Sequence, residues 1–347
     1  MKRLKLFLGL VAALFMAVTG STYAQTHFEV SDAPTDGRWA ANTKWYFLHF
    51  VNSDAYHTAG YMGTKGDAYI NSNGQLLLNG TDKPLNAGGI WCFVGDAENG
   101  YKIYNRNTGT SKILSMTTDN NGVAKMLDEG TEGNTQRFDC ATTTNAGAAF
   151  TGKATLKFHG STNSYLNNSD GTPKCHVGVW SDDQALGAAG SVIDIIEVTD
   201  DELYNMGLKV KVSTENDKHY FMLKSKRSGK YAGFDGNNGL TQIAYFDVDA
   251  KAFWYVTQDG SGYKIHNAAT EKIVDGTTMT AAGSTMYIDE NKFNPGYFCI
   301  STDADNTTAG SCWDESSPIS IGTWAPTASD ADGTSWSIEN LTTNYAK

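Results

Sequence analysis

The chain is poor in proline and in charge. Only 6 of its 347 residues are proline, and only 19% are Asp, Glu, Lys or Arg. Helical periodicity is nearly absent beyond the first 24 residues. Glycine is by contrast frequent, with 36 residues, and Asn, Thr, Ser and Gly separate short apolar runs. This texture predicts an all-β protein with many turns.

The motifs of several enzyme classes are absent as well. The histidines form no His-Glu-x-x-His pattern, which excludes a zincin site, and there is no Gly-x-Ser-x-Gly nucleophile elbow. No glycine-rich phosphate loop and no Cys-x-x-Cys pair occur. The loops Asp235–Gly239 and Ser329–Gly333 share part of a calcium-loop pattern but lack its terminal Glu. We therefore predict a protein that is not an enzyme, with no catalytic residue, no metal and no cofactor.

Positive charge is in short supply. The formal net charge is −11, and loss of the three cations in the first 24 residues makes it −14. Such a surface repels phosphate backbones and anionic lipid headgroups. No apolar run beyond residue 24 is long enough to cross a bilayer. We therefore expect neither a nucleic-acid partner nor membrane insertion.

Residues 1–24 have the three parts of a secretory signal peptide. Three cations lie within the first five residues, an apolar run follows from Leu6 to about Val18, and small residues lead to Ala24. The apolar run is too short for a bilayer core of about 30 Å, which argues against a membrane anchor. We expect cleavage after Ala24 and export to the periplasm, the cell surface or the medium.

The five cysteines leave at least one thiol unpaired within a monomer. Cys299 and Cys312 flank a stretch that is typical of a hairpin turn, and export permits a disulfide between them. Two buried thiols are the alternative. Cys92 follows Trp91 in an apolar run and is expected to be a small core residue.

One phrase occurs twice in the chain. Residues 99–105 read NGYKIYN and residues 261–267 read SGYKIHN, so that five of seven positions are identical. A strand centred on a tryptophan precedes each copy, at Trp91 and at Trp254. A turn and a short apolar strand follow each copy. The duplication therefore extends well beyond the phrase itself.

The ends of the two halves also correspond. Trp180 lies ten residues before a glycine, and Trp324 lies nine before another. We therefore predict two homologous domains, 26–200 and 214–347. Residues 201–213 form the linker or a short helix between them, for which Thr199 is a suitable cap.

Each half contains a weaker threefold pattern. A strand with its hairpin alternates three times with an apolar-x-apolar strand, and the last such strands are Ile193–Ile195 and Trp336–Ile338. Three repeats of this kind fit a β-trefoil, in which six strands close a barrel and hairpins cap it. The last strand is then expected to pair with the first. The prediction is two tandem β-trefoil domains, with two β-sandwiches or propeller blades as alternatives.

The repeats resemble those of the ricin-B-type β-trefoil lectins, which carry Tyr-x-Ile/Leu-x-Asn, a glycine turn and Lys-x-Leu, and end in Gln-x-Trp. YKIYNRNTGTSKIL, from Tyr101, fits this pattern, and YKIHNAATEKIV, from Tyr263, fits it without the turn glycine. Gln136–Phe138 is the nearest match to Gln-x-Trp. The resemblance covers most of both halves. The chain also resembles the tandem trefoil units of exported bacterial proteins that handle glycans. This resemblance implies carbohydrate binding.

Sugar binding needs an aromatic face for the C–H side of a pyranose, with Asp or Asn beside it. Trp180, followed by Asp182 and Asp183, is one candidate, and Trp324 is the other. Each tryptophan follows a Gly-x pair and precedes a polar loop. A tryptophan on the barrel floor is the alternative for both. Three further tryptophans lie inside apolar strands and are expected in the core, namely Trp91, Trp254 and Trp336.

Four more residues are candidates through the resemblance and the strand period. Asn105 and Asn267 occupy the family's Asn position, which implies a bond to a sugar hydroxyl, although an Asn at a turn is equally often structural. Tyr104 and His266 alternate with core-facing isoleucines, so they lie on the opposite face of their strands.

The leading hypothesis is an exported, non-catalytic carbohydrate-binding protein whose partner is a glycan or polysaccharide bound in shallow aromatic and polar pockets. A protein-interaction or protease-inhibitor module on the same scaffold is the alternative, and its partner is a protein. A glycosidase is the third, because a carboxylate pair cannot be distinguished from surface charge by sequence.

Overall fold

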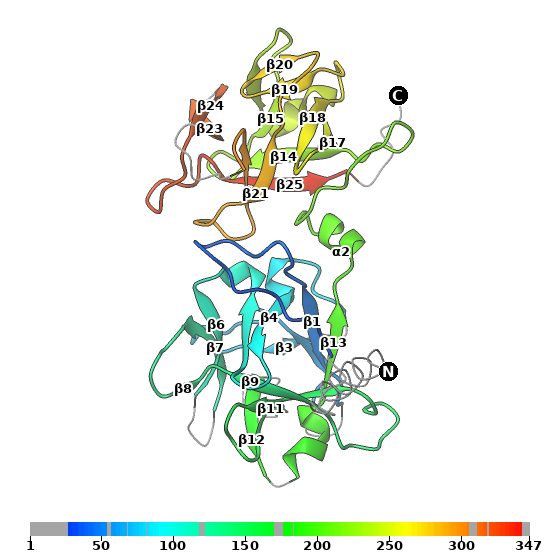
Figure 1. The fold of residues 1–347 in the computed structure, drawn as a ribbon, viewed down its shortest axis with the longest axis vertical. Helices are drawn as coiled ribbons and strands as arrows, with labels where there is room; N and C mark the ends of the chain where they lie inside the picture. The colour runs from blue at the N-terminus through cyan, green and yellow to red at the C-terminus, as the bar shows by residue number, and fades with distance from the viewer. Residues whose placement is uncertain are drawn as a thin grey trace, which may run out of the picture.

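The computed structural model describes residues 27–53, 57–67, 69–80, 82–117, 122–169, 176–182, 184–304, 311–317 and 319–341. The predicted signal peptide, Cys175 and Asp183 lie outside the described residues. Two antiparallel sheets contain nearly all of the regular structure, and they form two units stacked along the long axis of the molecule (Figure 1). The prediction of an all-β protein is confirmed.

Six strands close a ring in the first unit. They are β1 (Tyr46–Phe50), β4 (Trp91–Asp96), β5 (Gly100–Asn105), β9 (Phe138–Thr142), β10 (Ala154–Phe158) and β13 (Ile193–Glu197). Each strand pairs with the next, and β10 pairs with β13. The strand β13 then pairs with β1 along its whole length, from Glu197 opposite Tyr46 to Ile193 opposite Phe50. The ring therefore has no free edge.

Three hairpins cap this ring. They are formed by β2 (Gly60–Met62) with β3 (Leu78–Asn79), by β6 (Lys112–Thr117) with β7 (Ala124–Asp128), and by β11 (Ser164–Ser169) with β12 (His176–Ser181). The short strand β8 (Asn134–Thr135) pairs with β6. A closed ring of six strands with three capping hairpins is a β-trefoil.

The second unit repeats this arrangement. Its ring consists of β14 (Phe221–Ser225), β17 (Trp254–Asp259), β18 (Gly262–Asn267), β21 (Tyr287–Glu290), β22 (Phe298–Ser301) and β25 (Trp336–Asn340). A bridge between Tyr263 and Met286 joins β18 to the start of β21. The strand β25 pairs with β14 and closes the ring. The caps are β15 (Tyr231–Phe234) with β16 (Leu240–Ile243), β19 (Ile273–Asp275) with β20 (Thr278–Thr280), and β23 (Cys312–Ser317) with β24 (Ser320–Trp324).

The prediction of two tandem β-trefoils is confirmed, including the pairing of the last strand with the first. The remaining elements are 3-10 turns at η1 (Ala87–Gly89), η2 (Arg106–Thr108), η3 (Ala185–Gly187), η4 (Ala189–Ser191), η5 (Tyr245–Asp247) and η6 (Ala250–Ala252), and one helix.

Buried tryptophans connect the rings to their caps. Trp91, Trp254 and Trp336 have no exposed surface, as expected from their apolar strands. Their indole N–H groups donate to carbonyl oxygens of the cap strands β2, β15 and β23 at 3.0–3.1 Å. A buried indole stabilises a core only if its N–H is satisfied. Each tryptophan therefore fills the barrel floor and fixes a hairpin above it.

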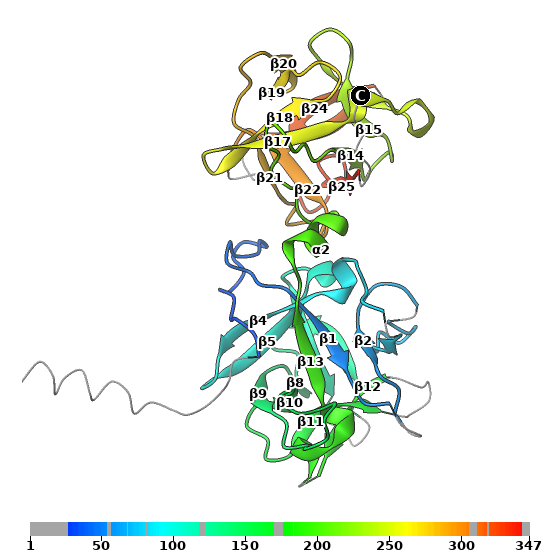
Figure 2. The same cartoon turned by 90° about the vertical axis from the view of Figure 1, so that its right-hand side faces the viewer.

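The helix α2 (Asp200–Asn205) lies between the two units (Figures 1 and 2). Thr199 and Glu202 form a capping box, with each side chain bonded to the other's backbone N–H. The helix lies in the gap between β13 and β14, where the linker is predicted. The exact domain bounds stay a prediction.

An ion pair joins the two units. Arg106, just after β5, contacts Glu290, at the end of β21, at 3.1 Å, and their side chains are only 9% and 12% exposed. The guanidinium of Arg106 also lies 5.0 Å from the ring centre of Trp45. Because both charges are withdrawn from water, loss of one leaves the other without its counter-charge.

We expect Arg106→Met to lower the free energy of unfolding by about 3 kcal/mol, because the buried charge of Glu290 then loses its counter-charge. Urea unfolding followed by tryptophan fluorescence measures this loss. The double variant Arg106→Met with Glu290→Met is the control, and it should lose clearly less than the sum of the two single variants. Additive losses would show that the two side chains are not coupled.

Candidate functional site

Two hollows of suitable size occur among the described residues. The first, the junction pocket, has a volume of about 940 Å³ and is walled by the segment before β1, the linker and β21. The second, the Trp180 pocket, has a volume of about 860 Å³ and lies beside β12 of the first unit. Both lie within the range of known ligand sites.

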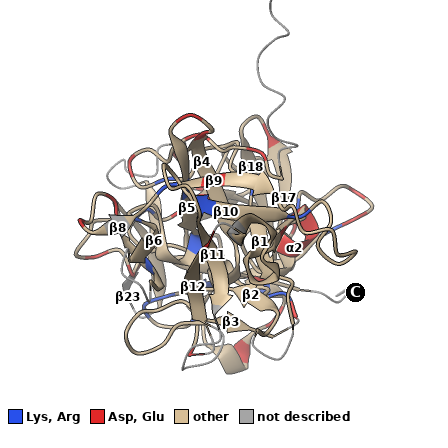
Figure 3. Ribbon diagram, turned by 90° about the horizontal axis from the view of Figure 1, so that it is seen from below, with Lys and Arg blue, Asp and Glu red and all other residues tan. Residues whose placement is uncertain are grey.

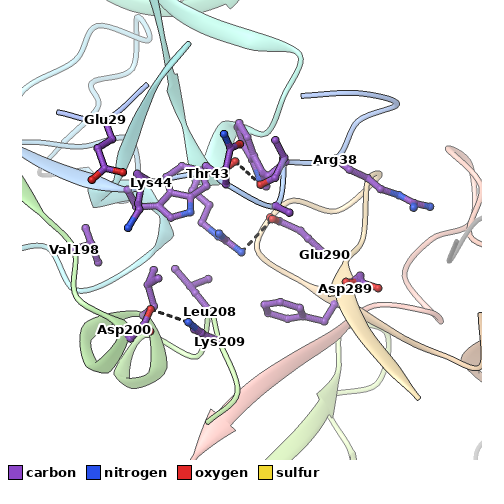
Figure 4. A pocket seen from close by; sticks show the side chains of 18 of the residues that line it. Glu29, Arg38, Thr43, Lys44, Val198, Asp200, Leu208, Lys209, Asp289 and Glu290 are labelled. Atoms are coloured by element: carbon purple, nitrogen blue, oxygen red, sulfur yellow. Dashed lines mark hydrogen bonds and ion pairs between the residues drawn. The ribbon is translucent and has the colours of Figure 1, made fainter. Parts of the chain in front are cut away.

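The junction pocket is lined by charges that satisfy one another (Figure 4). Lys209 pairs with Asp200 at 2.7 Å, and Lys44 pairs with Glu197 at 3.4 Å. The pair of Arg106 and Glu290 crosses the same space. The aromatic faces here are not open, because Trp45 is buried and Trp39 packs edge-on against it at 4.9 Å. The pocket is therefore a polar seam between the units.

Asp289 is a carboxyl in this seam with a raised pKa. Burial raises its pKa, and the nearby charge of Arg38 only partly opposes this. The ionised form is thus less favourable in the folded chain than in the unfolded chain.

The Trp180 pocket has the composition of a sugar site. Trp180, near the end of β12, is 48% exposed and presents an aromatic face. Asp182 and Gln184 lie on the loop that follows, and Asn167 contributes from the partner strand β11. An exposed ring with amide and carboxylate groups beside it can stack on a pyranose and bond its hydroxyls.

Hydrogen bonds from outside the pocket hold its loop in place. Thr143 donates through Oγ1 to the carbonyl of Leu186 at 2.9 Å, and Asn145 donates through Nδ2 to that of Gly187 at 2.8 Å. Within the loop, the N–H of Gln184 donates to Asp182 at 2.8 Å. These contacts place the polar groups before any ligand arrives.

A buried acceptor lies next to the pocket wall. Asn168 donates through Nδ2 to two backbone carbonyls, but its Oδ1 has no hydrogen-bond partner among the described residues. A Cβ on Gly190, which lines the pocket, would lie only 2.7 Å from this oxygen. A side chain at position 190 would therefore collide with Asn168, so that glycine is required there.

The structure corrects the prediction for three residues. Asn105 and Asn267 have no exposed surface, and their amides donate to backbone carbonyls near the start of β4 and β17. Tyr104 is buried against Trp39, and burial raises the pKa of Tyr104 to about 12. All three support the fold, because Asn105 and Asn267 are fully buried and Tyr104 is only 5% exposed, which leaves too little surface to contact a sugar.

His266 is partly buried and has an internal partner. Its ring stacks on Tyr255 at 4.6 Å, and its Nε2 is 2.9 Å from the hydroxyl of Thr257. Burial lowers the pKa of His266, so it is neutral at pH 7. Its side chain holds the β17–β18 pair together.

The other predicted residues are divided between the units. Trp180 and Asp182 meet in one pocket, whereas Asp183 lies outside the described residues. Trp324 is 53% exposed at the end of β24 in the second unit. Sequence reasoning missed Asn167 and Gln184. Asn167 could have been found from its position, because its strand β11 forms a hairpin with the strand β12 that carries Trp180.

Cys299 and Cys312 are both buried thiols, hydrogen-bonded to each other across β22 and β23. The structure has no disulfide between them, and their pairing stays a prediction. Cys92 is a fully buried core residue, as expected.

The described residues contain no group of three His, Cys, Asp or Glu side chains that could hold a metal ion. Within the same ranges, no helix is long and apolar enough to cross a membrane. Seen from the end of the first unit, Asp and Glu positions are spread over several loops and form no single patch (Figure 3).

A comparison with protein-family models matches part of the second unit. Residues 208–289 match the family described as ricin-type beta-trefoil lectin domain-like. Over these residues the fold is ricin-B-type and lectin-like. The resemblance predicted from the repeated phrase is thereby confirmed, since the match includes SGYKIHN. No curated protein matches the chain.

Solved structures similar to this chain include three proteins of low identity. The hemolytic lectin CEL-III is 11% identical with a TM-score of 0.30, over 85% of this chain and 63% of its own. A GlcNAcα1-4Gal-releasing endo-β-galactosidase from Clostridium perfringens is 8% identical with a TM-score of 0.33, over 90% and 70%. A non-toxic homologue of type II RIPs from Momordica charantia, in complex with α-methyl-D-galactoside, is 9% identical with a TM-score of 0.25, over 86% and 97%. The chain thus spans less than two thirds of CEL-III.

We expect Asp289→Asn to raise the stability of the protein at neutral pH. Burial raises the pKa of Asp289, so its ionised form costs stability above that pKa, and the neutral amide avoids the cost. The gain should disappear as the pH falls and the wild-type carboxyl becomes protonated. Urea unfolding between pH 3 and 7 measures it. Asp200→Asn, at an exposed pair in the same seam, is the control and should change stability by no more than about 0.5 kcal/mol. An equal response of both variants would contradict the assignment.

Proposed function

We infer that the protein is an exported, non-catalytic carbohydrate-binding protein, and that the Trp180 pocket is its binding site. The observation that carries this proposal is the exposed face of Trp180 beside Asp182, Gln184 and Asn167 in one hollow. Export rests on residues 1–24, which have the pattern of a signal peptide.

The chemistry of a pyranose assigns a different role to each side chain of the pocket. A pyranose is apolar on its C–H face and polar at its rim, so the indole of Trp180 takes the face. Gln184 and Asp182, both exposed, take hydroxyl groups at the rim. Asn167 is buried and donates to Ser191 at 3.0 Å, so it supports the pocket floor. Such a shallow site, fixed by loop hydrogen bonds, suits weak and selective glycan binding.

The family likeness of the second unit supports the same class of ligand, because ricin-type domains of this kind are described as lectin-like. The absence of the enzyme motifs named above supports a protein that binds glycans without cleaving them. The partner is then a glycan or polysaccharide outside the cytoplasm.

A protein partner is the second candidate function, and one observation favours it. Phe246 is 93% exposed and Tyr245 is 66% exposed, side by side on η5 of the second unit. Adjacent exposed aromatics are enriched at protein interfaces. This surface is separate in sequence and in unit from the Trp180 pocket.

We expect Trp180→Ala to weaken glycan binding about tenfold or more, because loss of the stacking face costs on the order of 1.4 kcal/mol. A glycan array probed with residues 25–347 provides the measurement. Phe246→Ala, which removes an aromatic ring that is even more exposed, is the control and should bind like the wild type. If no glycan binds the folded protein, the proposed function is wrong. A pull-down that depends on Phe246 would then favour the protein partner.

A further inference from the structure

The third cap of the second unit is the structural counterpart of the hairpin that carries Trp180. In the first unit, Trp180 on β12 faces Tyr165 and Gly178 faces Asn167. In the second, Trp324 on β24 faces Cys312 and Gly322 faces Asp314. The register therefore places Trp324 where the first unit has Trp180. It also places Asp314 and Glu315 where the first unit has Asn167 and Asn168.

A glycine confirms this equivalence from the other side of the site. Gly190 precedes β13 and Gly333 precedes β25, the two ring-closing strands. A Cβ on Gly190 would contact Asn167 and Asn168, and a Cβ on Gly333 would contact Asp314. A glycine therefore lies against the third cap hairpin in both units. Behind it are the amides of Asn167 and Asn168 in the first unit and the carboxylate of Asp314 in the second.

The two sites differ in what covers them. After β1 the chain continues as Val51, whose N–H donates to Val192, and after β14 it continues as Lys226, whose N–H donates to Ser335. The positions Val51 and Asn52 therefore correspond to Lys226 and Arg227. Two positions that hold neutral residues in the first unit therefore hold cations in the second.

Both cations are bound to the loop that follows Trp324. Lys226 pairs with Asp332 and Arg227 pairs with Asp330, each at 2.5 Å. Arg227 also donates to the carbonyl of Glu315 at 2.9 Å, and its guanidinium lies against Gly333. These contacts hold the loop after Trp324 against the third cap hairpin. The corresponding loop of the first unit lines an open pocket.

One carboxylate beneath this cover is left over. Asp314 is only 7% exposed, and the cation that acts on it, Arg227, is already paired with Asp330. A buried carboxylate is costly unless a cation or donor compensates it. The charge of Arg227 lies near it, and the exposed ring of Trp324 lies at the end of the same hairpin.

We propose that the second unit holds a second sugar site, selective for a glycan with protonated amino groups, which Lys226 and Arg227 close by occupying its carboxylates. This proposal rests on the proposed function, because it assigns Trp324 the stacking role of Trp180. An ammonium group on an amino sugar replaces an internal cation at Asp330 or Asp332, with Asp314 as a further carboxylate nearby, and the indole takes the sugar face. The native chain therefore binds through its first unit, and the second site stays closed.

The test uses calorimetric titration of the chain, residues 25–347, with the β1,4-linked trimer of glucosamine at a pH where its amines are charged. Its N-acetylated trimer is the matched uncharged probe. The variant Lys226→Gln with Arg227→Gln opens the site while it keeps side-chain length and polarity. We expect it to bind the charged trimer about tenfold more tightly than the wild type, a gain of ~1.4 kcal/mol. The uncharged trimer should show no such gain.

Two further variants separate site binding from general attraction to negative charge. Addition of Trp324→Ala to the open variant should abolish the gain, whereas addition of Trp180→Ala should leave it intact. A gain that survives Trp324→Ala, or no gain in a variant with a native unfolding transition, overturns the proposal. If the double variant does not fold, Lys226→Gln alone frees Asp332, and it should still bind the charged trimer more tightly than the wild type. No gain in that single variant also overturns the proposal.

These outcomes are distinct from failure of the proposed function. That function fails if the wild type binds no glycan on an array, or if its binding does not depend on Trp180. The second site is judged only by the charged trimer and by its dependence on Trp324. Each result can therefore occur without the other.

Discussion

The hydrogen bond from a floor tryptophan to a cap hairpin is the contact on which the rest of each unit depends. A ring of six strands encloses an apolar space, and a fully buried indole fills part of it. The indole N–H must then find an acceptor, and it finds one on a cap strand. The same side chain thus fills the core and sets the position of the hairpin above it.

The rims of the caps are the part of the scaffold that is free to differ. The floor positions Trp91 and Trp254 are the same in both units, because any change would leave a cavity or an unsatisfied polar group. The positions behind the third cap differ in charge, with Asn167 in one unit and Asp314 in the other. Duplication has preserved the packing and has altered the chemistry that faces a ligand.

The patterns that were predictable are those with a local physical cause. The alternation of apolar and polar residues predicted the strands. The duplicated phrase predicted two units, because the same sequence forms the same pairing of strands in each half. The capping box at Thr199 is also a local pattern, since its donors and acceptors lie within one turn. Asn105 was misassigned because a buried amide that bonds carbonyls and an exposed amide that bonds a sugar have the same sequence signature.

The sequence by itself determined the class of fold, the duplication and the core tryptophans, because these depend on periodicity and on the size of apolar side chains. Only the tertiary structure decided which polar residues meet. Asn167 and Gln184 join Trp180 through strand pairing and a loop held by Thr143, and neither contact has a fixed sequence spacing. The pair of Arg106 and Glu290 joins residues that are remote in sequence, so it exists only once both rings have closed.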